Sequence, residues 1–258
     1  MRLAGKKIIV TGGSRGIAKA VTMAYVAEGA MVAVLDILDE LGKRTVEEAS
    51  QKGPGKAFYY HCDISKRTEV EGVFEEVVKE LGGLDVIANI AGVDRNTKAI
   101  DATDEEFDFL MNINVRGTVL TNQAAFRAMS TQGYGTIINF GSDTGLVGTP
   151  NQAVYGATKA AVMSWTRTIA AEWGPYGIRV NNVVPAILTP MAEEYLENMS
   201  EEEIAEYHAV MKKMIPLGGQ LGNPEKDLAP VMVFFASEDS RFISGQTIPV
   251  NGGLNSVR

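Results

Sequence analysis

The sequence of 258 residues contains only one cysteine, Cys62, and two histidines, His61 and His208. A single cysteine excludes an intrachain disulfide. The absence of disulfides is typical of proteins from a reducing compartment. A closed zinc site needs about four ligands. The run "HCD" at residues 61–63 therefore predicts the end of a strand, with side chains that alternate between two faces, and no metal site.

Long apolar runs and an excess of positive charge are also lacking. The basic start of the chain has an apolar run of only Ile8–Val10, too short for the core of a signal peptide, and no stretch approaches a membrane span. The formal net charge is -8 and the pI is about 5.0, which disfavours nucleic acid and anionic membranes as partners. We therefore expect a cytoplasmic protein that acts on a small molecule.

Short apolar segments alternate with longer helical patterns along the whole chain. The predicted strands are "KKIIVTG", "MVAVLD", "KAFYYHCD", "LDVIANIAG", "GTIINFGS", "IRVNNVVP" and "GQTIPVNGG", and the predicted helices cover Gly16–Glu28, Glu40–Gln51, Glu69–Leu81, Asp104–Met129, Val154–Trp173, 193–213 and 225–236. This alternation predicts an α/β fold, a doubly wound, Rossmann-type parallel sheet with helices on both faces, as a single domain over residues 1–258. Because the strands are nearly all apolar, we expect them to be buried on both sides.

The stretch "IIVTGGSRGIAKA" places glycines between the first predicted strand and the first predicted helix. Gly12 allows a tight turn and Gly16 lets backbone approach a pyrophosphate at the helix N-terminus. Asp36 ends the second strand, where a carboxylate binds the adenosine ribose hydroxyls and repels a 2′-phosphate. Arg15 argues the other way, because a cation there could meet a 2′-phosphate. We give Asp36 more weight, so the sequence predicts NAD as cofactor.

The stretch "VYGATKAAV" carries Tyr155 and Lys159 four residues apart in a predicted helix. Positions i and i+4 share one helix face, so both side chains can point at one ligand. A free tyrosine has a pKa near 10, and a cation within about 4–6 Å favours the phenolate. We therefore expect Lys159, helped by the positive charge of the oxidised nicotinamide, to lower the pKa of Tyr155, which then acts as general base toward an alcohol or general acid toward a carbonyl. The alternative is an i,i+4 contact on an exposed, solvated face of the helix.

Several short motifs occur in a fixed order: "TGGSRGIA", "DIS" at 63–65, "NIAG" at 89–92, "NINVRG" at 112–117, Ser142 thirteen residues before Tyr155, "YGATK", and "VNGG" at 250–253. In this order the chain resembles the short-chain dehydrogenase/reductase family over essentially its whole length. The resemblance implies a seven-stranded parallel sheet, a bound nicotinamide dinucleotide and hydride transfer. It places the catalytic residues at Asn114, Ser142, Tyr155 and Lys159, with Ser142 positioning the substrate oxygen and Asn114 holding a water.

The glycine turn, the acid after strand two and the same resemblance together define the expected cofactor site. Its residues are Gly12, Ser14, Arg15, Gly16, Ile17, Asp36, Ile37, Asp63, Ile64, Asn89, Ala91, Gly92, Tyr155, Lys159, Pro185, Ala186, Ile187, Thr189 and Met191. The chain departs from the family pattern at Ala18, where a third glycine is usual, and at "VPAILTPM", where Ala186 replaces a glycine. Thr189 follows Pro185 by four residues, one fewer than usual, which weakens its expected cofactor contact.

Two features bear on partners and substrate. The helix from Gly156 to Trp173 is apolar around much of its circumference, and the resemblance implies that it packs in a homodimer or homotetramer. The long insertion at about 190–221 predicts a substrate lid. Its apolar side chains are Met191, Tyr195, Leu196, Met199, Tyr207, Met211, Met214, Ile215 and Leu217, and methionines adapt to irregular apolar shapes.

We therefore expect an NAD-dependent oxidoreductase of a bulky, hydrophobic, alicyclic or steroid-like secondary alcohol or ketone. Asp94 and Asp143 are candidate contacts to a second oxygen of that substrate. The alternative within the enzyme class is an NADP-dependent 3-oxoacyl or carbonyl reductase. The alternative from another class is a non-catalytic dinucleotide-binding sensor or scaffold, which the presence of both Tyr155 and Lys159 disfavours.

Overall fold

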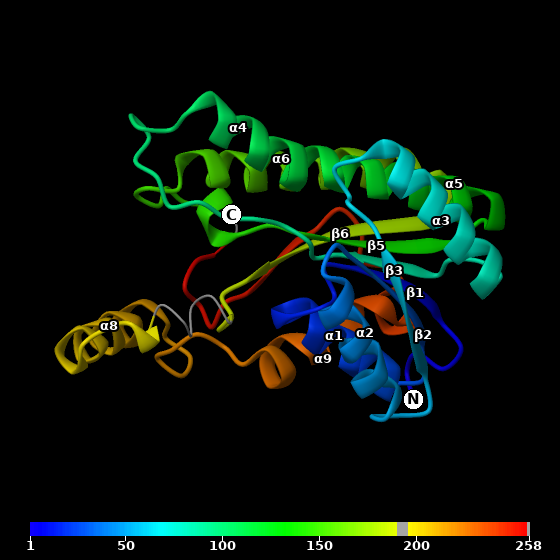
Figure 1. Ribbon diagram of the computed structural model, residues 1–258, viewed down its shortest axis with the longest axis horizontal. Helices are drawn as coiled ribbons and strands as arrows, with labels where there is room; N and C mark the ends of the chain where they lie inside the picture. The colour runs from blue at the N-terminus through cyan, green and yellow to red at the C-terminus, as the bar shows by residue number, and fades with distance from the viewer. Residues whose placement is uncertain (190–195, 257–258) are drawn as a thin grey trace.

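The computed structural model describes residues 1–189 and 196–256, and a seven-stranded sheet runs through its centre (Figure 1). The strands are β1 (Lys7–Thr11), β2 (Met31–Asp36), β3 (Lys56–His61), β4 (Val86–Asn89), β5 (Gly135–Phe140), β6 (Ile178–Pro185) and β7 (Thr247–Val250). Their spatial order is β3-β2-β1-β4-β5-β6-β7, and every neighbouring pair is parallel. The predicted doubly wound parallel fold is confirmed.

Helices cover both faces of the sheet (Figure 1). On one face lie α1 (Gly16–Ala27), α2 (Asp39–Ser50) and α9 (Ala229–Ala236), and on the other lie α3 (Arg67–Leu81), α5 (Thr118–Gln132) and α6 (Ala153–Trp173). Each face buries its own apolar cluster, as expected where helices sandwich a parallel sheet. The remaining long helix, α8 (Glu201–Met214), lies beyond the end of the sheet to which β6 leads.

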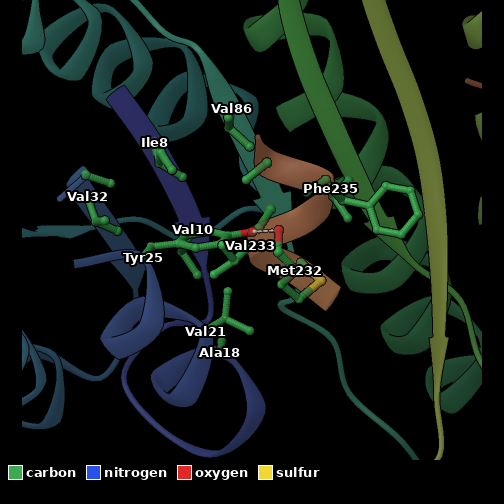
Figure 2. Packing of buried hydrophobic residues seen from close by; sticks show 14 of the residues in the cluster. Ile8, Val10, Ala18, Val21, Tyr25, Val32, Val86, Met232, Val233 and Phe235 are labelled. Atoms are coloured by element: carbon green, nitrogen blue, oxygen red, sulfur yellow. Dashed lines mark hydrogen bonds between the residues drawn. The ribbon is translucent and has the colours of Figure 1, made fainter. Parts of the chain in front are cut away.

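The packing of α1 against β1 and α9 fixes the start of the first helix. Figure 2 shows Val10, Val21 and Tyr25 meeting Met232 of α9, and the Tyr25 hydroxyl donates to the Met232 carbonyl at 3.3 Å. Burial raises the pKa of Tyr25 far above its ordinary value, so the phenol stays a neutral donor. Ala18 is buried in the same cluster, so the methyl that replaces a third glycine is accommodated as part of the core.

The expectation that the strands are buried on both sides is correct for the five central strands and wrong for the two at the edges. β3 alternates between exposed and half-buried residues, and all four residues of β7 are half-buried. An edge strand has a neighbour on one side only, so solvent reaches its side chains there. The mostly apolar strand sequence does not reveal which strands end up at the edges.

The predicted continuous helix over Asp104–Met129 is interrupted. The chain forms α4 (Asp104–Leu110), then a π-helical segment η1 (Met111–Gly117), and only then α5. In the first turn of α5, Thr118 Oγ1 donates to the carbonyl of Asn114 at 2.8 Å. This bond satisfies a carbonyl that the wider π-helical turn leaves without its usual backbone donor. Such π-bulges are frequent at functional sites, and Asn114 lies in the middle of this one, 1% exposed.

A buried network of amides and hydroxyls joins β4, β5, α5 and α6 behind the strand ends. Asn139 Oδ1 accepts from Nδ2 of Asn89 and Nδ2 of Asn122, both at 3.0 Å. Its own Nδ2 donates to Asn122 Oδ1 and to Thr166 Oγ1, also at 3.0 Å. Asn139 is therefore fully satisfied, and it holds the ends of β4 and β5 in register where the next loops begin.

Replacing this residue tests how much the network stabilises the fold. Asn139→Ala leaves several buried donors and acceptors without partners, and we expect it to lower the free energy of unfolding by about 3 kcal/mol. Urea denaturation measures the change, with the exposed Asn96→Ala as matched control. A loss no larger for Asn139→Ala than for Asn96→Ala would show that water or neighbouring groups replace the network at no cost.

Candidate active site

The glycine turn after β1 lies against the end of β4. Gly12 and Gly16 have φ angles of 71° and 56°, in the left-handed region that favours glycine. A Cβ on Gly12 would lie 2.9 Å from the Cα of Ala91, so a side chain there is also excluded by space. β1 and β4 are the neighbouring strands at which the order of the sheet reverses. In open α/β sheets, the crevice beside such strand ends binds the ligand.

The residues of this turn fit a dinucleotide phosphate group. Helix α1 begins at Gly16, and its first amides have no partner within the helix, so they can donate to an anion. Ser14 Oγ is buried, with no hydrogen-bond partner among the residues that the structure describes. Arg15 is exposed and Ile17 is half-buried. The free amides at the start of α1 are what a pyrophosphate would complete, whereas the Ser14 hydroxyl is enclosed beside Gly42 of α2.

Asp36, at the end of β2, is 9% exposed and already holds the neighbouring backbone. Its Oδ2 accepts from the amide of Ser14 at 3.0 Å. Its Oδ1 accepts from the amides of Ile37 at 2.8 Å and Leu38 at 3.1 Å. A carboxylate has about four acceptor positions, so capacity remains for a ribose hydroxyl. Ile37 itself is 57% exposed beside it.

A second acid that the sequence analysis did not single out lies next to Asp36. Asp39 Oδ1 accepts from the Tyr59 hydroxyl at 2.7 Å and lies 2.6 Å from Nδ1 of His61. The Tyr59 hydroxyl also donates to the carbonyl of Asp36 at 2.8 Å. Hydrogen bonds from Tyr59 and His61 lower the pKa of Asp39. His61 is thus part of an acid-histidine contact that Tyr59 links to Asp36.

The predicted adenine contacts follow β3. Asp63 Oδ1 accepts from the amide and the hydroxyl of Ser65, at 3.0 and 2.7 Å, which makes a tight turn. Ile64 is 8% exposed and lies against Gly117 of η1, where a Cβ would come within 2.8 Å of its side chain. Cys62 is buried, and burial raises the pKa of its thiol to about 12.

At the loop after β4, the side chain of Asn89 is hydrogen-bonded within the protein, and the backbone lies near the crevice between the ends of β1 and β4. Both polar atoms of the Asn89 side chain are taken, because Nδ2 donates to Asn139 and Oδ1 accepts from Thr121 Oγ1 at 2.7 Å. A cofactor contact at this position would therefore come from the backbone. The amide of Ala91 donates to Thr11 Oγ1 at 3.2 Å, and Gly92 lies exposed beside it.

The segment after β6 is pinned by backbone pairs on both sides. The amide of Ala186 donates to the carbonyl of Val250 at 3.0 Å, and that of Leu188 to the carbonyl of Gly222 at 2.9 Å. Ala186 and Ile187 are buried, whereas Pro185 and Thr189 are half-buried. Met191 and Tyr195 lie outside the described residues. The described part of this segment thus borders the crevice at the carboxyl end of β6.

The four residues predicted to be catalytic lie together on α6, η1 and the end of β5. Lys159 Nζ is 5.7 Å from the centre of the Tyr155 ring and donates to the carbonyl of Phe140 at 3.1 Å. Asn114 and Lys159 meet at Gly92, where a Cβ would be 3.1 Å from Asn114 Oδ1 and 3.4 Å from Lys159 Nζ. The side chain of Ser142 interacts with the Tyr155 hydroxyl in the direction that lowers the pKa of the phenol.

The expected lowering of the pKa of Tyr155 by Lys159 is wrong for the protein alone. Burial raises the pKa of Tyr155 to about 12, the negative charge of Asp94 adds to the rise, and the interaction with Ser142 only partly opposes it. Burial also lowers the pKa of Lys159 to about 8, although Asp94 pulls it upward. Desolvation disfavours the charged form of each group, so Tyr155 is a neutral phenol at neutral pH.

The two acids suggested as substrate contacts are both engaged elsewhere. Asp143 Oδ1 accepts from Nδ2 of Asn251 at 2.8 Å and Nδ2 of Asn255 at 3.2 Å, which ties the C-terminal segment to the loop after Ser142. Asp94 Oδ2 accepts from Gln152 Nε2 at 2.9 Å, and its Oδ1 is enclosed. These hydrogen bonds occupy one oxygen of each carboxylate, and the second oxygen of Asp94 is enclosed.

None of the described helices is both long and apolar enough to cross a membrane. A family model described as enoyl-(acyl carrier protein) reductase matches residues 12–255. The chain is 37% identical over 255 residues to the 3-oxoacyl-(acyl-carrier-protein) reductase FabG of Thermotoga maritima, covering 98% of this chain and 99% of that protein.

Two solved structures are similar over nearly the whole chain. A short-chain type dehydrogenase/reductase from Mycobacterium marinum superposes with a TM-score of 0.87 at 34% identity, covering 99% of this chain and 97% of the other. NAD+-bound xylitol dehydrogenase superposes with a TM-score of 0.90 at 29% identity, covering 98% of this chain and 100% of the other. The likeness therefore includes the glycine turn, the strand ends and α6 together.

Proposed function

The chain belongs to the short-chain dehydrogenase/reductase family, and we propose that within this oxidoreductase family it interconverts a secondary alcohol and a ketone with NAD. The observation that carries the proposal is the meeting of Tyr155, Lys159 and Ser142 beside the glycine turn of β1. A nicotinamide dinucleotide, which members of this family bind, supplies the hydride acceptor or donor when bound. The chain's own residues supply binding, orientation and the proton.

Proton transfer is assigned to the Tyr155 hydroxyl. In the reductive direction the neutral phenol donates its proton to the carbonyl oxygen of the substrate, while Ser142 holds that oxygen in place. The resulting phenolate is favoured by the ammonium of Lys159, which lies beside Gly92 and is assigned the contact to a ribose hydroxyl. In the oxidative direction the same phenolate takes the alcohol proton. Asn114 keeps the loop after β4 in position by bonding both backbone groups of Val93 at 2.8 Å.

NAD rather than NADP is proposed because two carboxylates flank the ribose position. Asp36 keeps acceptor capacity for hydroxyls, and Asp39, held by Tyr59 and His61, adds a second negative charge close by. A 2′-phosphate would meet both charges. Arg15 is exposed, and the structure gives it no fixed place beside Asp36.

For the substrate we propose a bulky, hydrophobic, alicyclic secondary alcohol or ketone. Helix α8 buries none of its side chains, and Val210, Met214 and Leu217 of the same insertion are exposed by 42%, 48% and 79%. Exposed apolar side chains beyond the end of β6 provide a surface for an apolar ligand. A second candidate is reduction of a 3-oxoacyl group, which the 37% identity to a 3-oxoacyl reductase favours.

A homodimer or homotetramer is also proposed, with α6 in its interface. The outer side of this helix presents the small exposed residues Ala157, Ala160 and Ser164. Small residues allow two helices to approach closely, so a second copy of α6 would pack well against this side. Sedimentation velocity of the purified protein measures the state directly.

Removing the phenol tests the catalytic assignment. Tyr155→Phe takes away the proton donor but leaves the glycine turn and Asp36 intact, so we expect kcat to fall by about 10²-fold to 10⁴-fold. The affinity for NAD, measured by isothermal titration, should stay within about threefold of wild type. If kcat of the variant is near normal, another group transfers the proton.

Removing the carboxylate at the ribose tests the choice of cofactor. Asp36→Ala loses charged hydrogen bonds to the ribose, and we expect the ratio of kcat/KM for NAD to that for NADP to fall by about tenfold or more. Because Asp36 also accepts from three backbone amides, the thermal unfolding midpoint of the variant is measured as well, to detect a loss of stability. Arg15→Ala, at the other charged residue of the expected cofactor site, is the comparison variant. A wild-type enzyme that prefers NADP contradicts the proposal and makes Arg15 the residue of interest.

A panel of alcohols tests the substrate class. We expect kcat/KM to be higher for cyclohexanol-type and sterol substrates than for glycerol, a hexose or xylitol. The reason is that moving an apolar ring from water onto an apolar protein surface is favourable. Reduced nicotinamide absorbance follows the reaction with NAD. A preference for a polyol would overturn the alicyclic assignment, and a preference for a 3-oxoacyl thioester would favour the second candidate.

A further inference from the structure

The loop after β5, which carries Ser142, is fixed against α6 by two close approaches of glycine. A Cβ on Gly145 would lie 2.8 Å from the amide nitrogen of Ala160, and a Cβ on Gly156 would lie 2.9 Å from the carbonyl oxygen of Thr144. The backbone of the loop therefore rests directly on the backbone of the helix at both points. Because α6 also carries the tyrosine to which proton transfer is assigned, the Ser142 loop is a fixed part of the site.

Asp143 joins this loop to the C-terminal turn (residues 251–255). Its Oδ1 accepts from Nδ2 of Asn251 at 2.8 Å and from Nδ2 of Asn255 at 3.2 Å. Asn251 is 5% exposed, and its own Oδ1 accepts from the amide of Gly253 at 3.1 Å, so the turn is folded around this side chain. Hydrogen bonds to a carboxylate are stronger than those between neutral groups, and a single oxygen of Asp143 therefore fixes both ends of the turn.

The C-terminal turn in its turn holds the base of the insertion that follows β6, at residues 215–217. The amide of Leu217 donates to the carbonyl of Gly252 at 2.9 Å. Ile215 is 1% exposed and lies directly against Gly252, where a Cβ would come within 2.6 Å of its side chain. Gly252 has a φ of 61°, so both the backbone conformation and the space that Ile215 fills require glycine. A chain of contacts thus runs from Asp143 through the C-terminal turn to the base of the insertion.

The side chains on either side of the buried Ile215 are apolar and exposed. Met214 is 48% exposed and Leu217 is 79% exposed. An exposed apolar side chain gains free energy when an apolar ligand covers it. How well these side chains cover a bulky substrate depends on the distance from the base of the insertion to the Ser142 loop, and the contacts of Asp143 set that distance.

We propose that Asp143 is a positioning residue that fixes the base of the insertion relative to Ser142 and so favours bulky secondary alcohols and ketones over small ones. Its Oδ1 is occupied by two amides, and it acts through them. A small alcohol is held at the Ser142 and Tyr155 hydroxyls without the insertion, whereas a ring alcohol also contacts the apolar side chains beside Ile215. The substrate preference rests on the proposed function, whereas the link from Asp143 to the insertion does not.

The kinetic test compares a ring alcohol with a small one in Asp143→Ala, which removes the acceptor for both amides. We expect KM for cyclohexanol to rise by about tenfold and the ratio of kcat/KM for cyclohexanol to that for isopropanol to fall by about the same factor. The affinity for NAD, measured by isothermal titration, should stay within about threefold of wild type, because Asp143 is not part of the expected cofactor site. If both alcohols lose kcat/KM equally, the residue only supports the loop and the proposal is wrong.

Three further variants separate the hydrogen bonds of Asp143 from its packing. Asp143→Asn keeps an acceptor oxygen on a side chain of the same length and should retain most of the preference for cyclohexanol. Asp101→Ala removes an exposed acid from another loop and should leave the ratio for the two alcohols in place. Asn255→Ala removes one of the two donors without changing the Ser142 loop, and it should raise KM for cyclohexanol by a smaller factor. Should Asp143→Ala fail to fold, an unchanged KM for cyclohexanol in Asn255→Ala would overturn the proposal.

Hydrogen-deuterium exchange tests the link from Asp143 to the insertion without any turnover. In Asp143→Ala the peptide that contains Leu217 should exchange about tenfold faster, because the acceptor of its amide, Gly252, belongs to the loosened turn. Peptides from β5 and α6 should keep the exchange rates of wild type. Faster exchange in a protein that oxidises neither alcohol would support the link and overturn the proposed function. Unchanged exchange in an active enzyme would overturn the link alone.

Discussion

The structure depends most on the burial of one cation, Lys159, beside one phenol, Tyr155. Both lie on α6, and the helix places them one turn apart. In a low-dielectric setting each group resists its charged form, and this is why the pKa of the tyrosine rises to about 12 while that of the lysine falls to about 8. At neutral pH the resting site therefore holds a neutral phenol and a lysine that is still mostly protonated, and the charges of ligands decide when the phenol ionises. A positively charged ligand ring beside Tyr155 would favour the phenolate, and a carbonyl oxygen would accept the proton that the phenol holds.

The surrounding fold keeps these two groups dry and fixed. The amide network around Asn139 locks the ends of β4 and β5, from which the loops carrying Gly92 and Ser142 start. The π-helical turn η1 rotates Asn114 so that it clamps Val93 and contacts Thr158 at 3.1 Å. A regular α-helix in its place would shift every residue of α5 relative to Asn114. The departure from regular helix is thus part of how the loop after β4 is held against α6.

Local patterns in the sequence predicted the fold, the glycine turn and the shared face of Tyr155 and Lys159, because these follow from short-range rules, whereas Asn114 and Ser142 were expected only from the family resemblance. Strand-helix alternation predicts the parallel sheet, positive-φ glycines mark the turn at Gly12, and the i,i+4 spacing puts Tyr155 and Lys159 on one face. The pKa direction of Tyr155 could not be predicted in this way, since burial and the charge of Asp94 arise from segments far apart in the chain. The engagement of Asn89 and Asp143 also escaped prediction, because their partners Asn139 and Asn251 come from other strands and loops. Asp39 could have been noticed three residues after Asp36, but only the fold brings Tyr59 and His61 to it.

In the proposed function, Asp36 combines recognition of the cofactor and stability of the fold in one side chain. Its three backbone hydrogen bonds tie the glycine turn to the loop after β2, so the acid shapes the phosphate cradle before any ribose arrives. A change of cofactor preference that removes this carboxylate also releases the amides of Ser14, Ile37 and Leu38. Buried amides that lose their acceptor destabilise the turn, and a loosened turn would weaken binding of both dinucleotides. Under the proposed use of NAD, a full switch to NADP therefore requires a cation for the 2′-phosphate together with a new acceptor for those amides.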